Sequence, residues 1–321
     1  AFQEDDAALT KERWRERLLI KPLKNYAVSD HYNGQRFHNL ERNPRDRNAL
    51  FSWLLTRRPA QWPAWVENEN FPVPPQRLSN DSAEWRVTFI NHATVLVQIG
   101  PYNVLTDPVW SNRVSPFLRM GPKRVRQAGV SLADLPPIDI ILLSHNHYDH
   151  MDLATLRVIE KRDKPLVVTG LGNASLLRAN GLQTISELDW WESVSFQSLT
   201  IHFTPAQHFS GRSMRDRNAS LWGSFWVDTP KGALYFAGDT GYDDHFESIA
   251  EEYGSFDCAL LPIAPIYPIA HNKESHLDPA LAIKAFIDLR AKIFIPIHWG
   301  VLAFGTESLM YPLQETRRML K

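Results

Sequence analysis

The sequence predicts an α/β protein in which two mixed β-sheets pack face to face and helices cover the outer faces, an αββα sandwich. Short apolar runs typical of strands alternate with helical segments from about residue 85 onward. A group of strands followed by strand–helix units occurs twice, which favours two packed sheets. The run at 138–143 is apolar apart from Asp139, as in a strand that is buried on both faces.

Local signals support most of the individual elements. Gly100-Pro101 is a turn signal between two of the first strands. Asp152 is suited to cap a helix over 152–160, because its carboxylate can accept a hydrogen bond from a free backbone N–H. Asp278-Pro279 opens a helix that ends at Leu289, with Asp as the cap and Pro at the first helical position. The other expected elements are a helix over 174–179 and strands over 87–90, 95–99, 103–106, 138–143, 166–169, 194–196, 200–204, 220–227, 233–237, 257–263 and 292–297.

Residues 1–80 differ from the rest of the chain because they are polar, aromatic and interrupted by proline. Only two helices are expected there, over 9–19 and 48–56. Since so few apolar periodic segments cannot build a core, we expect residues 1–80 to form an N-terminal extension packed on a main domain of residues 81–321.

Composition excludes several classes of protein. The chain has 321 residues, 44% of them hydrophobic and 22% charged, which is typical of a globular protein. A net charge of −1 provides no general attraction for nucleic acid, and no apolar run is long enough to span a bilayer. The single cysteine cannot form an internal disulfide. The sequence starts at Ala1, so we expect an exported, periplasmic or membrane-associated protein rather than a cytoplasmic one.

The most informative stretch has the pattern H-x-H-x-D-H and follows the apolar run at 138–143. It contains His145, His147, Asp149 and His150. Burying three imidazoles and a carboxylate without partners would be costly. A pair of divalent metal ions would satisfy them, because His nitrogen and Asp oxygen are ordinary ligands of zinc.

Further candidate ligands follow other expected strands, where α/β enzymes place ligand-binding loops. These candidates are His208, Asp239 and His298, and Asp107 also stands at a strand end.

These motifs resemble those of the metallo-β-lactamase superfamily, and within it those of the N-acylphosphatidylethanolamine-hydrolysing phospholipase D family. The resemblance covers roughly residues 85–305. The matching stretches are 90–97, 105–108, 121–124, 135–139, 144–150, 187–191, 204–208, 221–224, 236–242 and 297–300.

The resemblance implies an αββα sandwich with two metal ions. The first ion would take His145, His147 and His208, the second would take Asp149, His150 and His298, and Asp239 would bridge the two. We expect zinc because it suits a site rich in histidine, with iron or manganese as the alternatives.

The resemblance also implies a phosphodiesterase of phospholipase D type that acts on N-acylphosphatidylethanolamine-like phospholipids or related diesters. Hydroxide formed at the metal pair would attack the phosphorus. The expected partners are this substrate, a membrane surface contacted peripherally and a second copy of the chain, with no nucleic acid. A metal-dependent lactonase is the alternative, since the same ligand set serves it. A non-catalytic metal-binding protein is disfavoured by the complete ligand set.

Several residues are candidates for roles beside the ligands. Asp149 and Asp239 are expected to take part in catalysis. Tyr148 either donates a hydrogen bond to the substrate or packs on its loop. His276 either contacts the substrate phosphate or belongs to the loop that precedes the helix. Asp107 is expected to orient the ligand loop without binding metal, and His92 to play a similar supporting role.

A small basic cluster comprises Lys123, Arg124 and Arg126. It is expected either to attract a phosphate head group or to be a solvated run on the surface.

Overall fold

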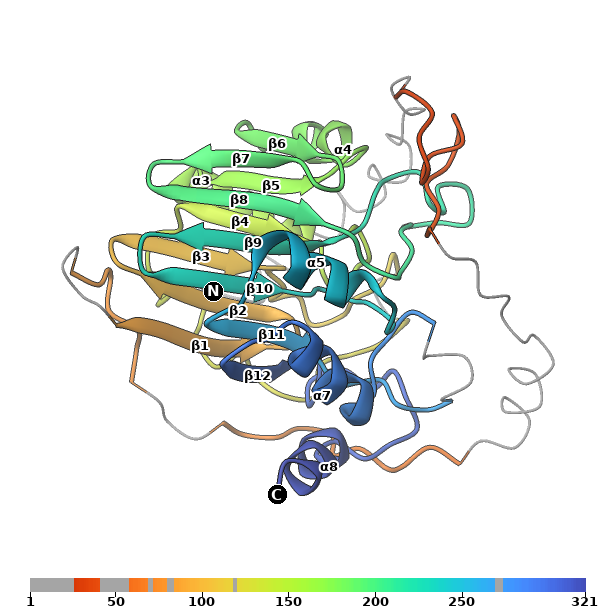
Figure 1. Ribbon diagram of the computed structural model, residues 1–321. Helices are drawn as coiled ribbons and strands as arrows, with labels where there is room; N and C mark the ends of the chain where they lie inside the picture. The colour runs from red at the N-terminus through yellow and green to blue at the C-terminus, as the bar shows by residue number, and fades with distance from the viewer. Residues whose placement is uncertain (1–25, 41–57, 69–71, 80–83, 118–119, 269–273) are drawn as a thin grey trace.

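The structure is a computed structural model that describes residues 26–40, 58–68, 72–79, 84–117, 120–268 and 274–321. Two six-stranded sheets, ordered β1-β2-β3-β4-β5-β6 and β12-β11-β10-β9-β8-β7, lie face to face with helices on the outside (Figure 1). The predicted αββα sandwich is therefore confirmed. In the described part of the chain, no helix combines the length and the apolar character needed to cross a bilayer.

The first sheet begins with antiparallel hairpins and continues as parallel strands, the last three of which are joined by helices. Strands β1 to β3 pair antiparallel, whereas β3 to β6 pair parallel. Its elements are β1 (Trp85–Asn91), β2 (Thr94–Ile99), β3 (Tyr102–Thr106), β4 (Ile140–Leu143), α3 (Leu153–Asp163), β5 (Leu166–Gly170), α4 (Ala174–Ala179) and β6 (Ile185–Leu188). Asp152 caps α3 by accepting a hydrogen bond from Ala154 N, as predicted.

The second sheet repeats this plan. Strands β7 to β10 pair antiparallel, and β10 to β12 pair parallel. Its elements are β7 (Ser193–Phe196), β8 (Leu199–Thr204), β9 (Ser224–Thr229), β10 (Gly232–Phe236), α5 (His245–Tyr253), β11 (Cys258–Pro262), α7 (Pro279–Asp288) and β12 (Ile293–Ile297), followed by α8 (Tyr311–Met319). Asp278 caps α7 by accepting from Leu281 N.

Three apolar clusters hold the layers together. The cluster between the sheets contains Val95 and Phe203, one from each sheet, both fully buried. A second cluster packs α3 and α4 on the first sheet, and a third packs α5 and α7 on the second. Each fully buried side chain of this size contributes about 1.5–3 kcal/mol by leaving water, so the layers associate through their apolar faces.

The structure differs from the sequence prediction at several elements. The strand expected over 220–227 begins only at Ser224, because Leu221 N and Gly223 N donate to Leu171 O and Ser144 O and not to a neighbouring strand of the second sheet. Strand β6 and helices α5 and α8 were missed, since none of them carries a continuous apolar run or a strong cap. The helices expected over 9–19 and 48–56 lie outside the described residues.

The described residues 26–40 pack against the sandwich. Tyr32 and Phe37 are buried in the cluster between the sheets. His31 lies with its Nε2 2.7 Å from Asp189 Oδ1, with its Nδ1 2.5 Å from Asp30 Oδ1, and with its ring stacked on Trp190 at 4.4 Å. An ion pair and apolar burial therefore hold this segment in place.

The stability that His31 provides should depend on pH. Burial lowers the pKa of His31, but the bonds with Asp189 and Asp30 outweigh burial, so the pKa lies above its usual 6.5. A group with a raised pKa stabilises the fold fully below its unfolded pKa, and this contribution is lost as the pH rises through the folded pKa. We expect His31→Gln to lower the melting temperature more at about pH 6 than at about pH 9. Calorimetry across this range tests it, and a constant difference would contradict the ion pair.

Candidate metal centre

The candidate ligands lie at the carboxyl ends of strands. His145, His147, Asp149 and His150 follow β4, while His208, Asp239 and His298 follow β8, β10 and β12. The last three strands run in the same direction, since β8 and β10 are both antiparallel to β9 and β10 to β12 are parallel. Their ends therefore meet at one edge of the sandwich (Figure 1).

Three imidazoles form one group of ligand atoms. His145 Nε2 lies 2.7 Å from His147 Nδ1, and His208 Nε2 lies 3.3 Å from the same His147 atom. His208 Nδ1 donates a hydrogen bond to Ser275 O at 2.8 Å, which leaves its Nε2 as the nitrogen with a lone pair. All three residues can offer one ligand atom to a common point.

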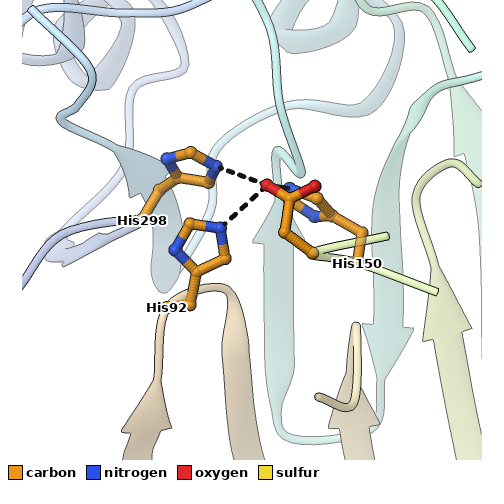
Figure 2. Close-up of side chains that lie close together, drawn as sticks. His92, His150 and His298 are labelled. Atoms are coloured by element: carbon orange, nitrogen blue, oxygen red, sulfur yellow. Dashed lines mark hydrogen bonds and ion pairs between the residues drawn. The ribbon is translucent and has the colours of Figure 1, made fainter. Parts of the chain in front are cut away.

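Asp149 is the centre of a second group. Figure 2 shows the imidazoles of His92, His150 and His298 arranged around a carboxylate. The Nε2 atoms of these residues lie 3.2, 3.5 and 3.7 Å from Asp149 Oδ2, respectively. Asp149 and the imidazoles can again offer ligand atoms to a common point.

Asp239 lies between the two groups. The Nε2 atoms of His150, His208, His276 and His298 lie 3.0–3.8 Å from one or other of its carboxylate oxygens. The structure thus brings the seven expected ligands close together, with Asp239 near histidines of both groups. His92 joins the second group, and His276 lies with Asp239 and His208.

Asp107 orients two of the ligands. Its carboxylate accepts hydrogen bonds from Ser144 N at 2.8 Å, from Ser144 Oγ at 2.6 Å and from His150 Nδ1 at 2.6 Å. Ser144 Oγ in turn lies 2.9 Å from His145 Nδ1. Because the Nδ1 atoms of both histidines are held in this way, their Nε2 atoms point into the site, which is the usual role of a carboxylate behind a metal ligand.

His92 supports the second group from its other side. Its backbone oxygen accepts a hydrogen bond from His298 N at 2.8 Å, and its ring centroid lies 3.8 Å from that of His298. Through Nε2 it also contacts Asp149 at 3.2 Å. Burial lowers the pKa of His92 to about 3, so the ring is neutral at physiological pH.

Without a metal ion, protons on the histidines balance the negative charges of the carboxylates in this site. Burial raises the pKa of Asp239, but the neighbouring His298 and His150 outweigh it and hold the pKa well below its usual range. Conversely, Asp239 and Asp149 overcome the effect of burial and raise the pKa of His298 to about 9. Burial leaves His147 neutral, with a pKa of about 4.

A pair of dications fits this residue set. His150 Nε2, His298 Nε2 and Asp239 Oδ1 are buried and have no hydrogen-bond partner among the described residues, although His298 Nε2 is only 3.0 Å from that oxygen. Buried polar atoms are normally paired. Ligand atoms that point at a shared cation lie close together without forming hydrogen bonds to one another, as these three atoms do.

The backbone at this edge is unusual. His92, Asp107 and His298 all have positive φ, at 44°, 29° and 64°. Such conformations cost energy and persist at functional sites where the surrounding structure holds them. Gly238 has φ 60°, and a Cβ there would lie 2.4 Å from Ser144 Cβ, so only glycine allows Asp239 to approach the segment after β4.

The remaining candidates occupy different positions. His276 lies 3.4 Å from Asp239 Oδ2 and is 18% exposed, so it is at the site and open to solvent. Tyr148 Oη donates to Arg212 O at 3.3 Å. Arg124 does not belong to a surface cluster, because it is buried and donates to Asn91 Oδ1 and Val109 O.

Two supporting residues have no clear signal in the sequence. Ser144 directly precedes the motif and links Asp107 to His145, a role that its position in the sequence does not indicate. Asn39 comes from the N-terminal segment, where its Nδ2 donates to His208 O at 3.1 Å and its Oδ1 accepts from Trp222 Nε1 at 3.1 Å. A single asparagine far from the motifs could not be singled out without the fold.

Comparisons with known proteins agree with this geometry. The model of the β-lactamase superfamily domain matches residues 102–299. The N-acyl-phosphatidylethanolamine-hydrolysing phospholipase D 1 of Caenorhabditis elegans is 36% identical over 245 residues, which are 73% of this chain and 69% of that protein. The mitochondrial enzyme of this name from Saccharomyces cerevisiae is 39% identical over 329 residues, which cover 92% of this chain and 69% of that protein.

A solved structure shares the fold. A metallo hydrolase from the archaeon Ignicoccus hospitalis superposes with a TM-score of 0.53 at 22% identity, and the match covers 67% of this chain and 82% of that one. The fold and the converging histidines and aspartates define a metallo-hydrolase, and they imply a dinuclear metal site. The chain belongs to the β-lactamase superfamily, and it is similar to the N-acyl-phosphatidylethanolamine-hydrolysing phospholipases D.

Metal binding should release protons. Ligand nitrogens must be deprotonated, whereas His298 has a pKa of about 9 before metal binds. At about pH 7.5 metal binding is therefore expected to expel protons, and the apparent affinity should rise with pH up to about 9. Calorimetric titration of the metal-free protein in buffers of different ionisation enthalpy measures this release. Binding heats that are independent of the buffer would count against these ligands.

Replacing Asp107 should weaken metal binding without removing a ligand. Asp107→Asn loses the charge that accepts from Ser144 and His150, and we expect a loss of about 10- to 100-fold in metal affinity. Competition with a chromophoric chelator measures it. Asp134→Asn is the matched control, because Asp134 is exposed and its carboxylate accepts a local hydrogen bond from Ser131 Oγ. Equal affinities in the two variants would show that Asp107 does not orient the ligands.

Proposed function

We propose that this chain is a binuclear metal-dependent phosphodiesterase of phospholipase D type that hydrolyses N-acylphosphatidylethanolamine-like phospholipids. The observation that carries the proposal is the 39% identity, over 92% of the chain, to a protein named for this reaction. The candidate histidine and aspartate ligands, all buried except the half-buried His147 and Asp149, support it, because metal ions held there would activate water and stabilise charge on the phosphoryl oxygens.

The proposed reaction adds water across one phosphorus–oxygen bond. The water oxygen bonds to phosphorus, the bond from phosphorus to the head-group oxygen breaks, and that oxygen takes a proton. The products are a phosphatidic acid and an N-acylethanolamine. Two dications held by the ligands, for which we propose Zn²⁺, would lower the pKa of water and stabilise charge on the phosphoryl oxygens.

Residues of the chain would hold the metal ions and contact the substrate in this reaction. Asp149 and Asp239 have pKa values well below their usual range, so both remain ionised as ligands. His276 is suited to contact a phosphoryl oxygen, because it is partly exposed and lies two residues before Asp278, the cap of α7, near a helix N-terminus where partial positive charge favours an anion. Ser275 Oγ lies 3.1 Å from His276 Nδ1 and holds the ring in this orientation.

Apolar rings beside the ligands suit a lipid substrate. The Phe304 ring lies 5.8 Å from that of His92 and 6.1 Å from that of His298, and the residue is 39% exposed. On the other side, the Phe209 ring lies 4.7 Å from the rings of His147 and His208. Ligand sites commonly combine apolar walls with a few polar groups, and acyl chains would be bound by such walls.

A substrate panel tests the proposal. With protein of measured metal content, we expect hydrolysis of N-acylphosphatidylethanolamine in mixed micelles and of bis-nitrophenyl phosphate, with phosphatidic acid as the lipid product. Treatment with a chelator should abolish both activities, and added Zn²⁺ should restore them. Rapid opening of acyl-homoserine or sugar lactones by metal-replete protein that leaves diesters intact would favour a lactonase instead.

His276 offers a test of substrate contact. We expect His276→Gln to lower kcat/KM for diesters by roughly 10²–10³-fold, as when one donor to a developing oxyanion is removed, while the metal content stays the same. His202→Gln is the control, since His202 stacks on Trp226 away from the ligands. A loss of bound metal in His276→Gln would identify His276 as a ligand, and unchanged kinetics would exclude both roles.

A further inference from the structure

The loop over residues 209–220 lies against the segment that carries four of the ligands. Arg212 Nη1 donates hydrogen bonds to Asn146 O at 3.1 Å and to Met151 O at 2.8 Å. These two carbonyl groups bracket His147, Asp149 and His150 in the chain. One guanidinium group thus connects both ends of the ligand segment.

Arg212 also contacts the middle of this segment. Its guanidinium carbon lies 3.9 Å from the centre of the Tyr148 ring, and Tyr148 Oη donates to Arg212 O at 3.3 Å. A planar guanidinium can stack on a ring and donate at its edge at the same time, which the ammonium group of lysine cannot do. The phenol of Tyr148 therefore serves as a platform for Arg212.

The loop itself is anchored so that Arg212 has little freedom. Asp216 is buried, and its carboxylate accepts hydrogen bonds from the backbone N of Arg212 at 3.0 Å and of Ser213 at 2.6 Å. Gly211 N donates to Asn146 Oδ1 at 2.7 Å, which adds a second link between the loop and the ligand segment. The backbone of Arg212 is thus fixed by Asp216, while its side chain binds the segment that carries the ligands.

We propose that Arg212 is a positioning residue for the dinuclear metal centre, which locks the ligand segment over 145–150 against the loop that begins at the ligand His208. His208 precedes Arg212 by four residues, and its Nε2 must meet His147 within 3.3 Å. Because these two ligands come from different sheets, their meeting depends on a link between the loops. Arg212 provides this link and contributes no ligand atom.

Metal release from the intact holoprotein tests the proposal. With excess chelator, Arg212→Lys should lose metal about 10- to 100-fold faster than the unmodified chain, as expected for loss of a residue that orients ligands. The visible spectrum of the Co²⁺-substituted protein should shift in the variant, because the ligand geometry changes. Arg215→Lys is the matched control, since Arg215 is exposed in the same loop and should leave both readouts unchanged.

The variants also separate positioning from a general loss of stability. Asp216→Asn loosens the loop without touching the ligand segment and should accelerate metal release in the same direction, by a smaller factor. If Arg212→Lys lowered the melting temperature of the metal-free protein but released metal at the unmodified rate, the proposal would be overturned. A fall in kcat/KM with normal metal release and an unshifted Co²⁺ spectrum would also overturn it, since Arg212 would then act on the substrate.

The inference rests on the metal centre and not on the reaction proposed for it. Metal release and the Co²⁺ spectrum need no substrate, so they report on Arg212 even if no phosphodiester is hydrolysed. Conversely, hydrolysis by the unmodified chain can be established without any result on Arg212.

Discussion

The rest of the structure depends on one constraint: the carboxylates of Asp149 and Asp239 lie among several imidazoles with little exposure to water. Asp239 is 4% exposed, and four imidazole nitrogens lie 3.0–3.8 Å from its carboxylate oxygens. Its Oδ1 makes no hydrogen bond with the described residues. In a medium of low polarity such a group is stable only if positive charge is supplied. Protons on His150 and His298 can supply it, and a pair of metal ions supplies it with the nitrogens in their ligand form.

The packed sheets around this cluster hold the carboxylates and imidazoles in place, so that they cannot move apart. The ligands stand at the ends of strands whose faces are filled with apolar side chains, so the loops begin from fixed points. Asp107 then sets the orientation of His145 and His150 through Ser144 and through a direct bond. The left-handed backbone of Asp107 and His298 is tolerated because the packed sheets can offset its local cost.

Segments remote in sequence complete the site. Asn39 reaches the backbone of His208 from the N-terminal part of the chain, and the buried rings of Tyr32 and Phe37 hold its segment on the sandwich. Residues outside the matched superfamily domain, which begins at residue 102, therefore contact the backbone of a candidate ligand. An aromatic-rich N-terminal segment is thereby given a physical role that its composition alone does not reveal.

The sequence by itself determined the sandwich and the set of candidate ligands, because strand periodicity and the H-x-H-x-D-H pattern are local properties. Asp152 and Asp278 were predicted as helix caps for the same reason. Strand β6 and helix α5 were missed, since tertiary packing and not local propensity stabilises them. Only the tertiary structure decided that Ser144, Asn39 and Arg212 support the ligands and that Arg124 is buried. Each of these roles depends on contacts between segments that are far apart in the chain, and such contacts leave no periodic signal in a single sequence.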